Sequence, residues 1–265
     1  MISTTTRRTP ALLPAEYGVE RYPWAEVGPE FIVAWGRPNG RWDPEHMTVY
    51  GKSGGGKSHF VCYVCKQRAL IRASDIVMLS TKRQDKTMTS MGWPLIRSWP
   101  PGYGENQVIL RIPAKGIDPE HLIPQRKRVR DFMNAIWVPD SNLVVVWDEL
   151  TYLEQDLGLK RQLAMFYREG RGNGITNIAT MQRPSGVTRL AHSEAGWTVA
   201  FPPKDVDDRD RVAEVLGDKQ RFRIILDGLD RTRHEFLMRH DLTGVTFISH
   251  LPAPGRGTGV RSRTR

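Results

Sequence analysis

The stretch "MTVYGKSGGGKSHFVCYV", residues 47–64, holds the triplet Gly-Lys-Ser twice. The P-loop pattern G-x-x-x-x-G-K-[ST] is satisfied in one frame, which starts at Gly51 and ends in Gly56-Lys57-Ser58. A frame on Lys52 fails, because His46 stands where its first glycine would have to be. A β-branched and aromatic strand pattern precedes the loop, and a helical pattern follows it. The stretch therefore predicts a phosphate-binding loop built around Lys57.

The chemistry of this loop suits the phosphates of a nucleotide. Glycines let backbone N–H groups curl around a β-phosphate, and the N-terminus of the following helix adds its partial positive charge. We expect Lys57 to reach the β- and γ-phosphates, and the Ser58 hydroxyl to ligate Mg²⁺. Lys52 stands second in the loop, where its side chain is free to point outward. The glycines expected to contact the nucleotide are Gly51, Gly54, Gly55 and Gly56.

An acidic pair after an apolar run would complete such a site. The segment "NLVVVWDEL", residues 142–150, is typical of a central strand of a parallel sheet, which is apolar on both faces. At the carboxyl end of that strand, Asp148 is expected to hold the Mg²⁺ shell, and Glu149 can polarise the attacking water as a general base. An acid in this second position favours an ATPase over a kinase or a GTPase. The expected cofactors are therefore ATP and Mg²⁺.

Strand patterns alternate with helix patterns along the chain, which predicts one α/β domain with a mostly parallel sheet. Expected strands cover residues 30–37, 46–51, 75–80, 106–112, 142–150, 175–181, 197–201, 221–226 and 234–240. Expected helices cover residues 58–71, 118–137 with Pro124 delaying the start, 153–170 and 206–216, and Asn39-Gly40 is an expected turn. The domain is expected over residues 21–250, between a flexible arm (1–20) and a disordered basic tail (251–265).

The charge balance and the cysteine content narrow the classes of partner. Lys and Arg number 39 against 29 Asp and Glu, a net charge of +10 that favours a polyanion, either nucleic acid or an anionic membrane face. Basic clusters lie at residues 80–87 and 125–130 and in the tail. The only two cysteines, Cys62 and Cys65, exclude a disulfide scaffold, and packing is favoured over a zinc site. No apolar run reaches the roughly 18 residues of a membrane helix.

A third element, "REGRGNGITNIATMQRPSGV", spans residues 168–187. Its arginine–glycine pair, apolar strand and Thr-x-Gln-Arg-Pro-Ser ending resemble the pattern of the FtsK/HerA superfamily of hexameric DNA-translocating ATPases. The resemblance covers about residues 45–240, and it implies a RecA-like P-loop NTPase fold of the additional-strand, catalytic-glutamate type. It also implies that Gln182 senses the γ-phosphate. Lys82, after the strand "IVMLSTK", is similar to a lysine of the family.

Ring ATPases of this kind complete each site with an arginine from the neighbouring subunit. The motif favours Arg168 and Arg171 for this role, and Arg209 is a further candidate. The resemblance thus implies a homo-oligomeric ring, a pentamer or a hexamer.

The function implied by the resemblance is translocation of double-stranded DNA, in viral genome packaging or in mobile-element transfer. A capsid portal or a membrane channel protein would be a further partner. The expected location is the cytoplasm, that of the host if the protein is viral, without membrane insertion. Two rivals stay open: a Zot-like assembly or export ATPase that acts on protein, and a nucleotide-gated binding module without translocation.

Overall fold

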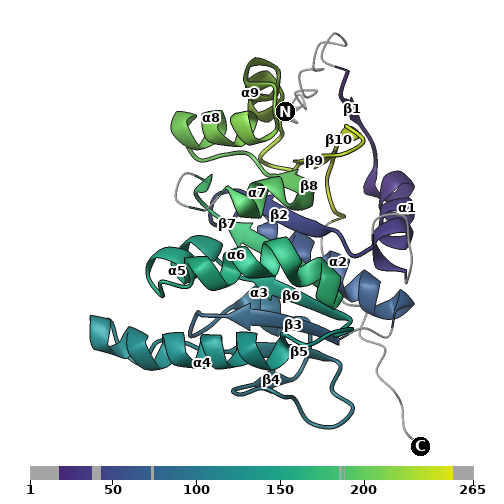
Figure 1. Ribbon diagram of the computed structural model, residues 1–265. Coiled ribbons are helices and arrows are strands. Elements are labelled where there is room, and N and C mark those ends of the chain that lie inside the picture. The colour runs from purple at the N-terminus through teal and green to yellow at the C-terminus, as the bar shows by residue number, and fades with distance from the viewer. Residues whose placement is uncertain (1–17, 38–42, 73–74, 185–186, 188, 253–265) are drawn as a thin grey trace, which may run out of the picture.

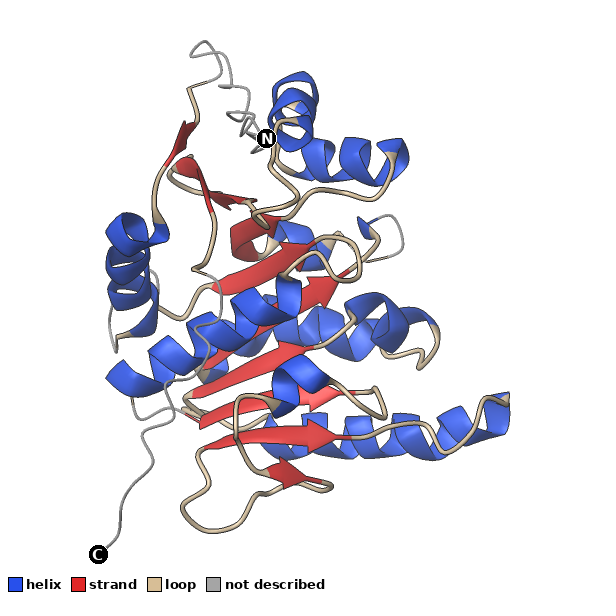
Figure 2. Ribbon diagram, turned by 180° about the vertical axis from the view of Figure 1, so that it is seen from behind, coloured by secondary structure: helices blue, strands red, loops and turns tan. Residues whose placement is uncertain are grey.

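The computed structural model describes residues 18–37, 43–72, 75–184, 187 and 189–252, and these form one ten-stranded sheet with helices on both faces (Figures 1 and 2). The strand order is β1-β10-β9-β8-β2-β7-β6-β3-β5-β4. The strands are β1 (Glu20–Arg21), β2 (His46–Tyr50), β3 (Asp75–Ser80), β4 (Leu95–Ile96), β5 (Gln107–Arg111), β6 (Leu143–Trp147), β7 (Ile175–Met181), β8 (Ala195–Ala200), β9 (Phe236–His240) and β10 (Thr246–Ser249).

The helices connect these strands and cover the two faces of the sheet. They are α1 (Trp24–Gly36), α2 (Lys57–Ile71), α3 (Lys86–Thr89), η2 (Pro119–His121), α4 (Leu122–Ile136), α5 (Leu150–Gln155), α6 (Lys160–Glu169), η3 (Gly170–Asn173), α7 (Leu190–Ser193), α8 (Val206–Val215) and α9 (Lys219–Asp227). Among the described helices, none is long and apolar enough to cross a membrane.

The centre of the sheet is parallel. Strand β2 lies between β7 and β8, β6 lies between β7 and β3, and all of these pairs are parallel. Only β9 runs against its neighbours, β8 and β10. The predicted mostly parallel α/β fold is therefore confirmed. The carboxyl ends of β2, β6 and β7 meet at one edge, because parallel neighbours end on the same side of a sheet.

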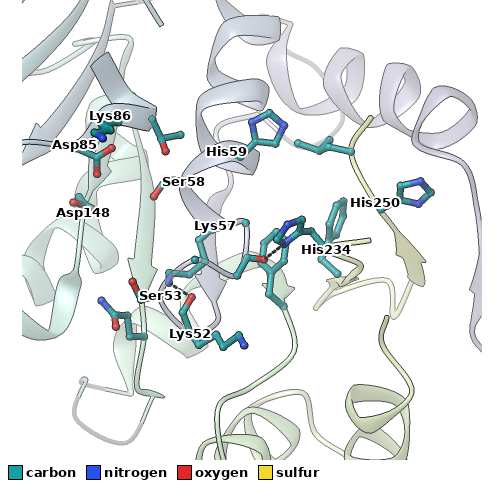
Figure 3. A pocket seen from close by; sticks show the side chains of 18 of the residues that line it. Lys52, Ser53, Lys57, Ser58, His59, Asp85, Lys86, Asp148, His234 and His250 are labelled. Atoms are coloured by element: carbon teal, nitrogen blue, oxygen red, sulfur yellow. Dashed lines mark hydrogen bonds between the residues drawn. The ribbon is translucent and has the colours of Figure 1, made fainter. Parts of the chain in front are cut away.

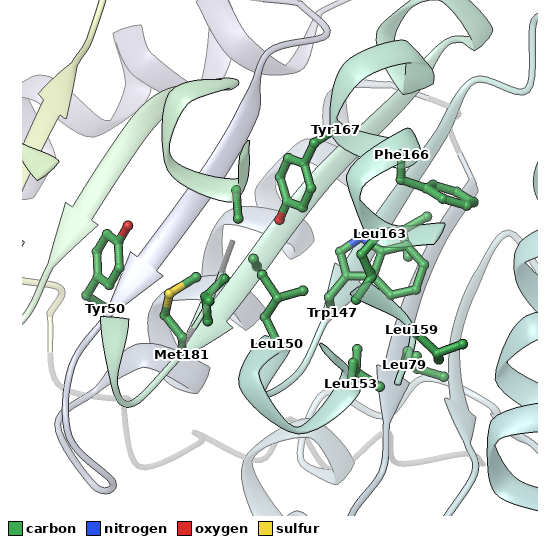
Figure 4. Packing of buried hydrophobic residues seen from close by; sticks show 14 of the residues in the cluster. Tyr50, Leu79, Trp147, Leu150, Leu153, Leu159, Leu163, Phe166, Tyr167 and Met181 are labelled. Atoms are coloured by element: carbon green, nitrogen blue, oxygen red, sulfur yellow. The ribbon is translucent and has the colours of Figure 1, made fainter. Parts of the chain in front are cut away.

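Alternation along the central strands divides the core between the two faces. In β3, Val77 and Leu79 pack under α4, α5 and α6, whereas Ile76 and Met78 pack with the residues of α1 and α2. Strand β6 is buried along its whole length, as its apolar run predicts. Figure 4 shows the first of these two clusters, where Trp147 of β6 meets Phe166 of α6 with ring centroids 5.3 Å apart.

Two predicted strands are helices. Of the predicted strand 30–37, residues 30–36 belong to α1, and residues 221–226 belong to α9. In α9 the buried side chains are Phe222, Ile225 and Leu226, a spacing of three and four residues that belongs to a helix rather than to a strand. The Asp218 carboxylate caps this helix by accepting the backbone N–H of Arg221 at 3.0 Å. The β-branched and aromatic residues of these segments favoured a strand prediction. That prediction is wrong because the spacing of the buried apolar residues decides the secondary structure more strongly than their residue types do.

Other boundaries also differ from expectation. The helix predicted over 153–170 is broken into α5 and α6, with Gly158 at φ 59° between them. Strand β9 is not the last strand, because β10 follows it, and the short β1, β4 and α3 were not predicted. The Asn39-Gly40 turn, and most of the expected arm and tail, lie outside the described residues.

A buried polar cluster joins three central strands to helix α6. Trp147 Nε1 donates to Asn177 Oδ1 at 3.0 Å, and Asn177 Nδ2 donates to the Phe166 carbonyl at 2.8 Å. The backbone N–H of Asn177 donates to Nδ1 of His46, at 3.1 Å. Burial, helped by the charge of Arg171, lowers the pKa of His46 to about 4. His46 is therefore a neutral acceptor inside the sheet at neutral pH.

We expect the stability of the fold to fall as pH drops from about 6.5 to about 4. Across this window the unfolded chain binds a proton on His46 and the folded chain does not, so acid favours unfolding. A shift of this size corresponds to about 3 kcal/mol in the free energy of unfolding. Urea unfolding at several pH values will show a shallower acid slope for His46→Asn. The surface variant His121→Asn serves as the control, and equal slopes in all three proteins would contradict the prediction.

Candidate active site

The P-loop connects the end of β2 at Tyr50 to the start of α2 at Lys57. Gly51 and Gly56 have φ values of 149° and 112°, and both lie against Phe201, which follows β8. A Cβ atom at Gly51 would stand 2.7 Å from Phe201 Cβ, and one at Gly56 would stand 2.8 Å from Phe201 Cε1. Both the backbone angle at Gly56 and this close approach require glycine. The neighbouring strand thus fixes the curl of the loop.

Lys57 lies inside this curl. Its ammonium donates to the carbonyl of Gly51 at 2.5 Å. It also donates to the carbonyl of Lys52 at 3.1 Å (Figure 3). Burial lowers the pKa of Lys57, although the carboxylates of Glu149 and Asp148 act in the opposite direction. The Lys52 side chain, in contrast, is half-buried and has no part in these contacts. Lys57 is therefore the lysine held at the centre of the loop.

Asp148 stands at the carboxyl end of β6 and is buried. Its Oδ1 accepts from the Thr180 hydroxyl at 3.2 Å, and its Oδ2 lies 2.9 Å from Lys82 Nζ. Burial alone would lower the pKa of Lys82, but the carboxylates of Asp148 and Asp85 outweigh it and the pKa is raised. Asp148 and Ser58 line the same cavity. The buried Asp148 carboxylate, which is already paired with the Lys82 ammonium, and the Ser58 hydroxyl provide oxygen ligands that fit Mg²⁺.

Glu149 and Gln182 contact each other across the ends of β6 and β7. Gln182 Nε2 donates to Glu149 Oε2 at 2.8 Å, and its backbone N–H donates to Oε1 at 3.3 Å. The Glu149 N–H in turn donates to the Thr180 hydroxyl at 3.1 Å, with Glu149 at φ 60°. The strand pairing thus brings the predicted base and the predicted sensor together. The contact of Gln182 with a γ-phosphate stays a prediction.

These side chains line one cavity of about 1010 Å³. Lys82 and Lys86, from the basic cluster 80–87, also line this cavity. Its opposite wall comes from residues that the sequence reasoning missed: Thr232, Arg233, His234, His250, Leu251 and Pro252. The order and direction of the strands could have identified this wall. Strand β9 is antiparallel to β8, so it begins at the edge of the sheet where β8 ends. The turn before β9 must therefore face the P-loop.

The two arginines predicted as trans fingers lie away from this cavity. Arg168, in the last turn of α6, and Arg171, in η3, are exposed and precede β7, whereas Gln182 follows that strand. Neither arginine lines the cavity of its own chain. Arg209 is engaged within the chain, since its guanidinium lies 2.7 Å from Asp227 Oδ2 and 3.3 Å from Asp210 Oδ1. These ion pairs favour a structural role for Arg209.

Cys62 and Cys65 are buried on α2 in the core cluster shared with α1. Burial raises the pKa of the Cys62 thiol to about 12. The two thiols therefore pack as small apolar groups, as their pattern predicted.

No protein-family description matches this sequence, and no curated protein matches it. Solved structures match its fold. The DNA-packaging ATPase B204 from Sulfolobus Turreted Icosahedral Virus is 13% identical, with a TM-score of 0.55, over 79% of this chain and 98% of that chain. The cytoplasmic domain of the Thermomonospora curvata type VII secretion ATPase EccC is 15% identical, with a TM-score of 0.55, over 81% of this chain and 26% of that chain.

The pCW3 conjugation coupling protein TcpA, in its monomer form with ATPγS, is 15% identical. Its TM-score is 0.51, over 78% of this chain and 61% of that chain. The chain therefore shares its fold with these ATPases and with the coupling protein, in agreement with the predicted P-loop NTPase fold.

Because the Lys57 ammonium is held inside the loop, Lys57→Ala should weaken binding of ATP by roughly 100-fold, the value of one or two charge-assisted hydrogen bonds. Lys52→Ala is the matched control, since it removes an equal charge from the same loop, and it should change binding by less than about threefold. Titration calorimetry with a non-hydrolysable ATP analogue and Mg²⁺ measures both. A larger loss for Lys52→Ala would overturn the assignment of the loop frame.

Proposed function

We propose that this chain is an ATP-hydrolysing motor that translocates double-stranded DNA, as in viral genome packaging or mobile-element transfer. The observation that carries the proposal is the convergence of Lys57, Asp148, Glu149 and Gln182 on one cavity at the carboxyl edge of the sheet. The fold similarity to a DNA-packaging ATPase and to a conjugation coupling protein supports the choice of DNA. The net charge of +10 agrees with a polyanionic substrate.

Each of these residues has a separate role in ATP hydrolysis. Lys57 and the loop N–H groups bind and orient the phosphates, and Ser58 and Asp148 would hold Mg²⁺. The metal, when bound, neutralises charge on the β- and γ-phosphates. Glu149 accepts the proton of the attacking water, and Gln182 holds the carboxylate of Glu149 in place through two hydrogen bonds. The cavity also places Lys82 beside Asp148, where it balances the buried negative charge.

The position of the arginines supports the proposal of a ring. Arg168 and Arg171 lie at the amino-terminal end of β7, and the catalytic groups lie at its carboxyl end. One subunit alone therefore lacks an arginine finger from this motif. A homo-oligomeric ring would bring the amino edge of one subunit to the cavity of the next.

A protein-directed ATPase is the second candidate. The similarity to the type VII secretion ATPase EccC favours it, because the same fold occurs there in a secretion ATPase. The two candidates share the catalytic residues, and they differ in the polymer that stimulates turnover.

ATP turnover of the assembled protein should rise several-fold with duplex DNA. It should rise less with single-stranded DNA and not at all with heparin, since a motor tracks a duplex rather than charge alone. The affinity for DNA should fall linearly with salt on a log–log scale. Glu149→Gln should bind ATP and DNA but hydrolyse at least ~100-fold more slowly. The control Glu169→Gln removes an exposed carboxylate of α6 and should be unaffected.

The outcomes separate the two candidates. If heparin stimulates ATP turnover as strongly as duplex DNA does, the basic charge of the protein attracts polyanions non-specifically and carries no preference for DNA. A correctly assembled multimer that no polyanion stimulates would favour the protein-directed ATPase. Unchanged turnover in Glu149→Gln would place the general base elsewhere.

Mixed subunits test the arginine. Arg171→Ala subunits keep an intact nucleotide pocket, and Lys57→Ala subunits keep Arg171, so each is inactive for a different reason. A mixture should recover part of the wild-type turnover, because an arginine finger acts only between subunits and is worth about 10³–10⁵ in rate. The same mixture with Arg168→Ala distinguishes the two arginines. Mixtures that assemble into rings but stay inactive would contradict the role of Arg171.

A further inference from the structure

Helix α4 carries a basic face that has no part in the chemistry proposed above. Its buried side chains are Gln125, Val129, Phe132, Met133 and Ile136. Its exposed side chains include Arg126, Lys127 and Arg130. The helix follows the carboxyl end of the parallel strand β5, so its first turns lie at the same edge of the sheet as the P-loop. Figure 1 shows α4 projecting beyond the sheet.

The exposed charges of α4 repel one another within the chain. Arg126 and Arg130 are four residues apart, which places them on the same side of the helix, about 6 Å apart along its axis. Like charges at this spacing destabilise a helix. Lys127, between them, pairs with Asp131 at 2.7 Å. The two arginines are thus a repelling pair on an exposed surface, and a bound anion would stabilise them.

The start of α6 adds two cations next to α4. Lys160 and Arg161 are the first two residues of α6, and both are exposed. A cation is unfavourable there, because the N-terminus of a helix already carries a partial positive charge. The turn before α6 lies against α4, since a Cβ atom at Gly158 would stand 3.1 Å from Nη2 of Arg126. We call Arg126, Arg130, Lys160 and Arg161 the α4–α6 face.

Two hydrogen bonds connect α4 to the segment that carries the catalytic acid. Gln125, which precedes Arg126, is buried, and its Nε2 donates to the Ile112 carbonyl just after β5, at 2.7 Å. Its Oε1 accepts from the Tyr152 hydroxyl at 2.6 Å. Tyr152 lies in α5, and its backbone N–H donates to the Glu149 carbonyl at 3.1 Å. A displacement of α4 would therefore reach the backbone of Glu149 through α5.

The chemistry of the α4–α6 face suits the phosphates of a nucleic acid. Three of its four cations are arginines, whose planar guanidinium groups bind phosphate oxygens through paired hydrogen bonds. Cations that stand one turn apart on a rigid helix can contact separate phosphates of a duplex. Contacts with the backbone fix the position of a protein on DNA without reading its sequence, as a motor that moves along DNA requires.

We propose that the α4–α6 face contacts the phosphate backbone of duplex DNA, and that Gln125 and Tyr152 transmit this contact to Glu149. Bound phosphates offset the repulsion between Arg126 and Arg130, and hydrolysis responds through α5. This inference rests on the proposed function, because it takes duplex DNA as the polymer that stimulates ATP turnover.

The first test measures binding of a duplex of arbitrary sequence to the full chain, with Mg²⁺ and a non-hydrolysable ATP analogue, over a range of salt concentrations. The double variant Arg126→Gln/Arg130→Gln should bind at least ~50-fold more weakly at about 0.1 M salt. Its slope of log affinity against log salt should fall by about two, since two phosphate contacts are lost.

The matched control is Arg37→Gln/Lys66→Gln, which removes the same charge from exposed positions after α1 and in α2. It should change the affinity by less than about threefold, because distant exposed charges are screened. Thermal unfolding verifies that the proteins are folded. The α4 double variant should be at least as stable as the wild type, because it removes a repulsive pair from the helix.

The second test isolates the link to Glu149. Tyr152→Phe removes only the hydroxyl that donates to Gln125. It should keep the DNA affinity and the salt slope of the wild type but lower the stimulation of ATP turnover by DNA about five-fold, the value of one hydrogen bond. Turnover without DNA should stay unchanged, whereas a structural defect would lower both rates alike. Tyr63→Phe, in α2, is the matched control.

Each contrary result has a defined meaning. If duplex DNA stimulates the wild type but the α4 double variant binds DNA with unchanged affinity and slope, the face is overturned and the proposed function stands. If Tyr152→Phe keeps full stimulation, or loses both rates alike, the link is overturned. If the double variant loses affinity for poly-glutamate but not for DNA, the face serves an acidic protein instead. A wild type that neither binds duplex DNA nor responds to it overturns the proposed function together with the face.

Discussion

The parallel pairing of β2 with β7 on one side and β8 on the other is the constraint on which the site depends. It brings the P-loop, the acidic pair and Gln182 to the same edge, because parallel strands in register end together. It also places Phe201 against Gly51 and Gly56, so that these two positions have room only for glycine. The catalytic groups are therefore positioned by strands rather than by flexible loops.

The charged side chains of the cavity are a second feature of the site, because each of them needs a partner. Two lysines and two carboxylates line the cavity, and each has a partner: Lys57 contacts loop carbonyls, Lys82 pairs with Asp148, and Glu149 accepts from Gln182. A buried charge without such partners would be costly. A nucleotide with its metal would enter a site in which both signs of charge are already paired, and binding would exchange these partners for phosphate oxygens and the metal.

The two edges of the sheet carry different residues. The carboxyl edge holds the cavity, whereas Arg168 and Arg171 precede β7 at the amino edge. The buried cluster of His46, Asn177 and Trp147 lies within the sheet. That cluster ties α6, which ends just before Arg171, to the same three strands that carry the P-loop, the acids and Gln182. A displacement of α6 would thus act on the strands that position the P-loop, the acids and Gln182.

The sequence by itself determined the P-loop frame, the acidic pair, the strand that ends in Gln182 and the parallel α/β class. Each of these depends on the residue types of contiguous segments and on the fixed spacing between those residues. It did not determine that 30–37 and 221–226 are helical, since their β-branched and aromatic residues satisfy either pattern until a core selects one face. Nor could it reveal the cavity wall of Arg233 and His250, which are 176 and 193 positions from Lys57 in the sequence. Only the antiparallel return of β9 beside β8 brings these side chains to the P-loop, because pairing between distant strands is a property of the folded sheet and not of any segment.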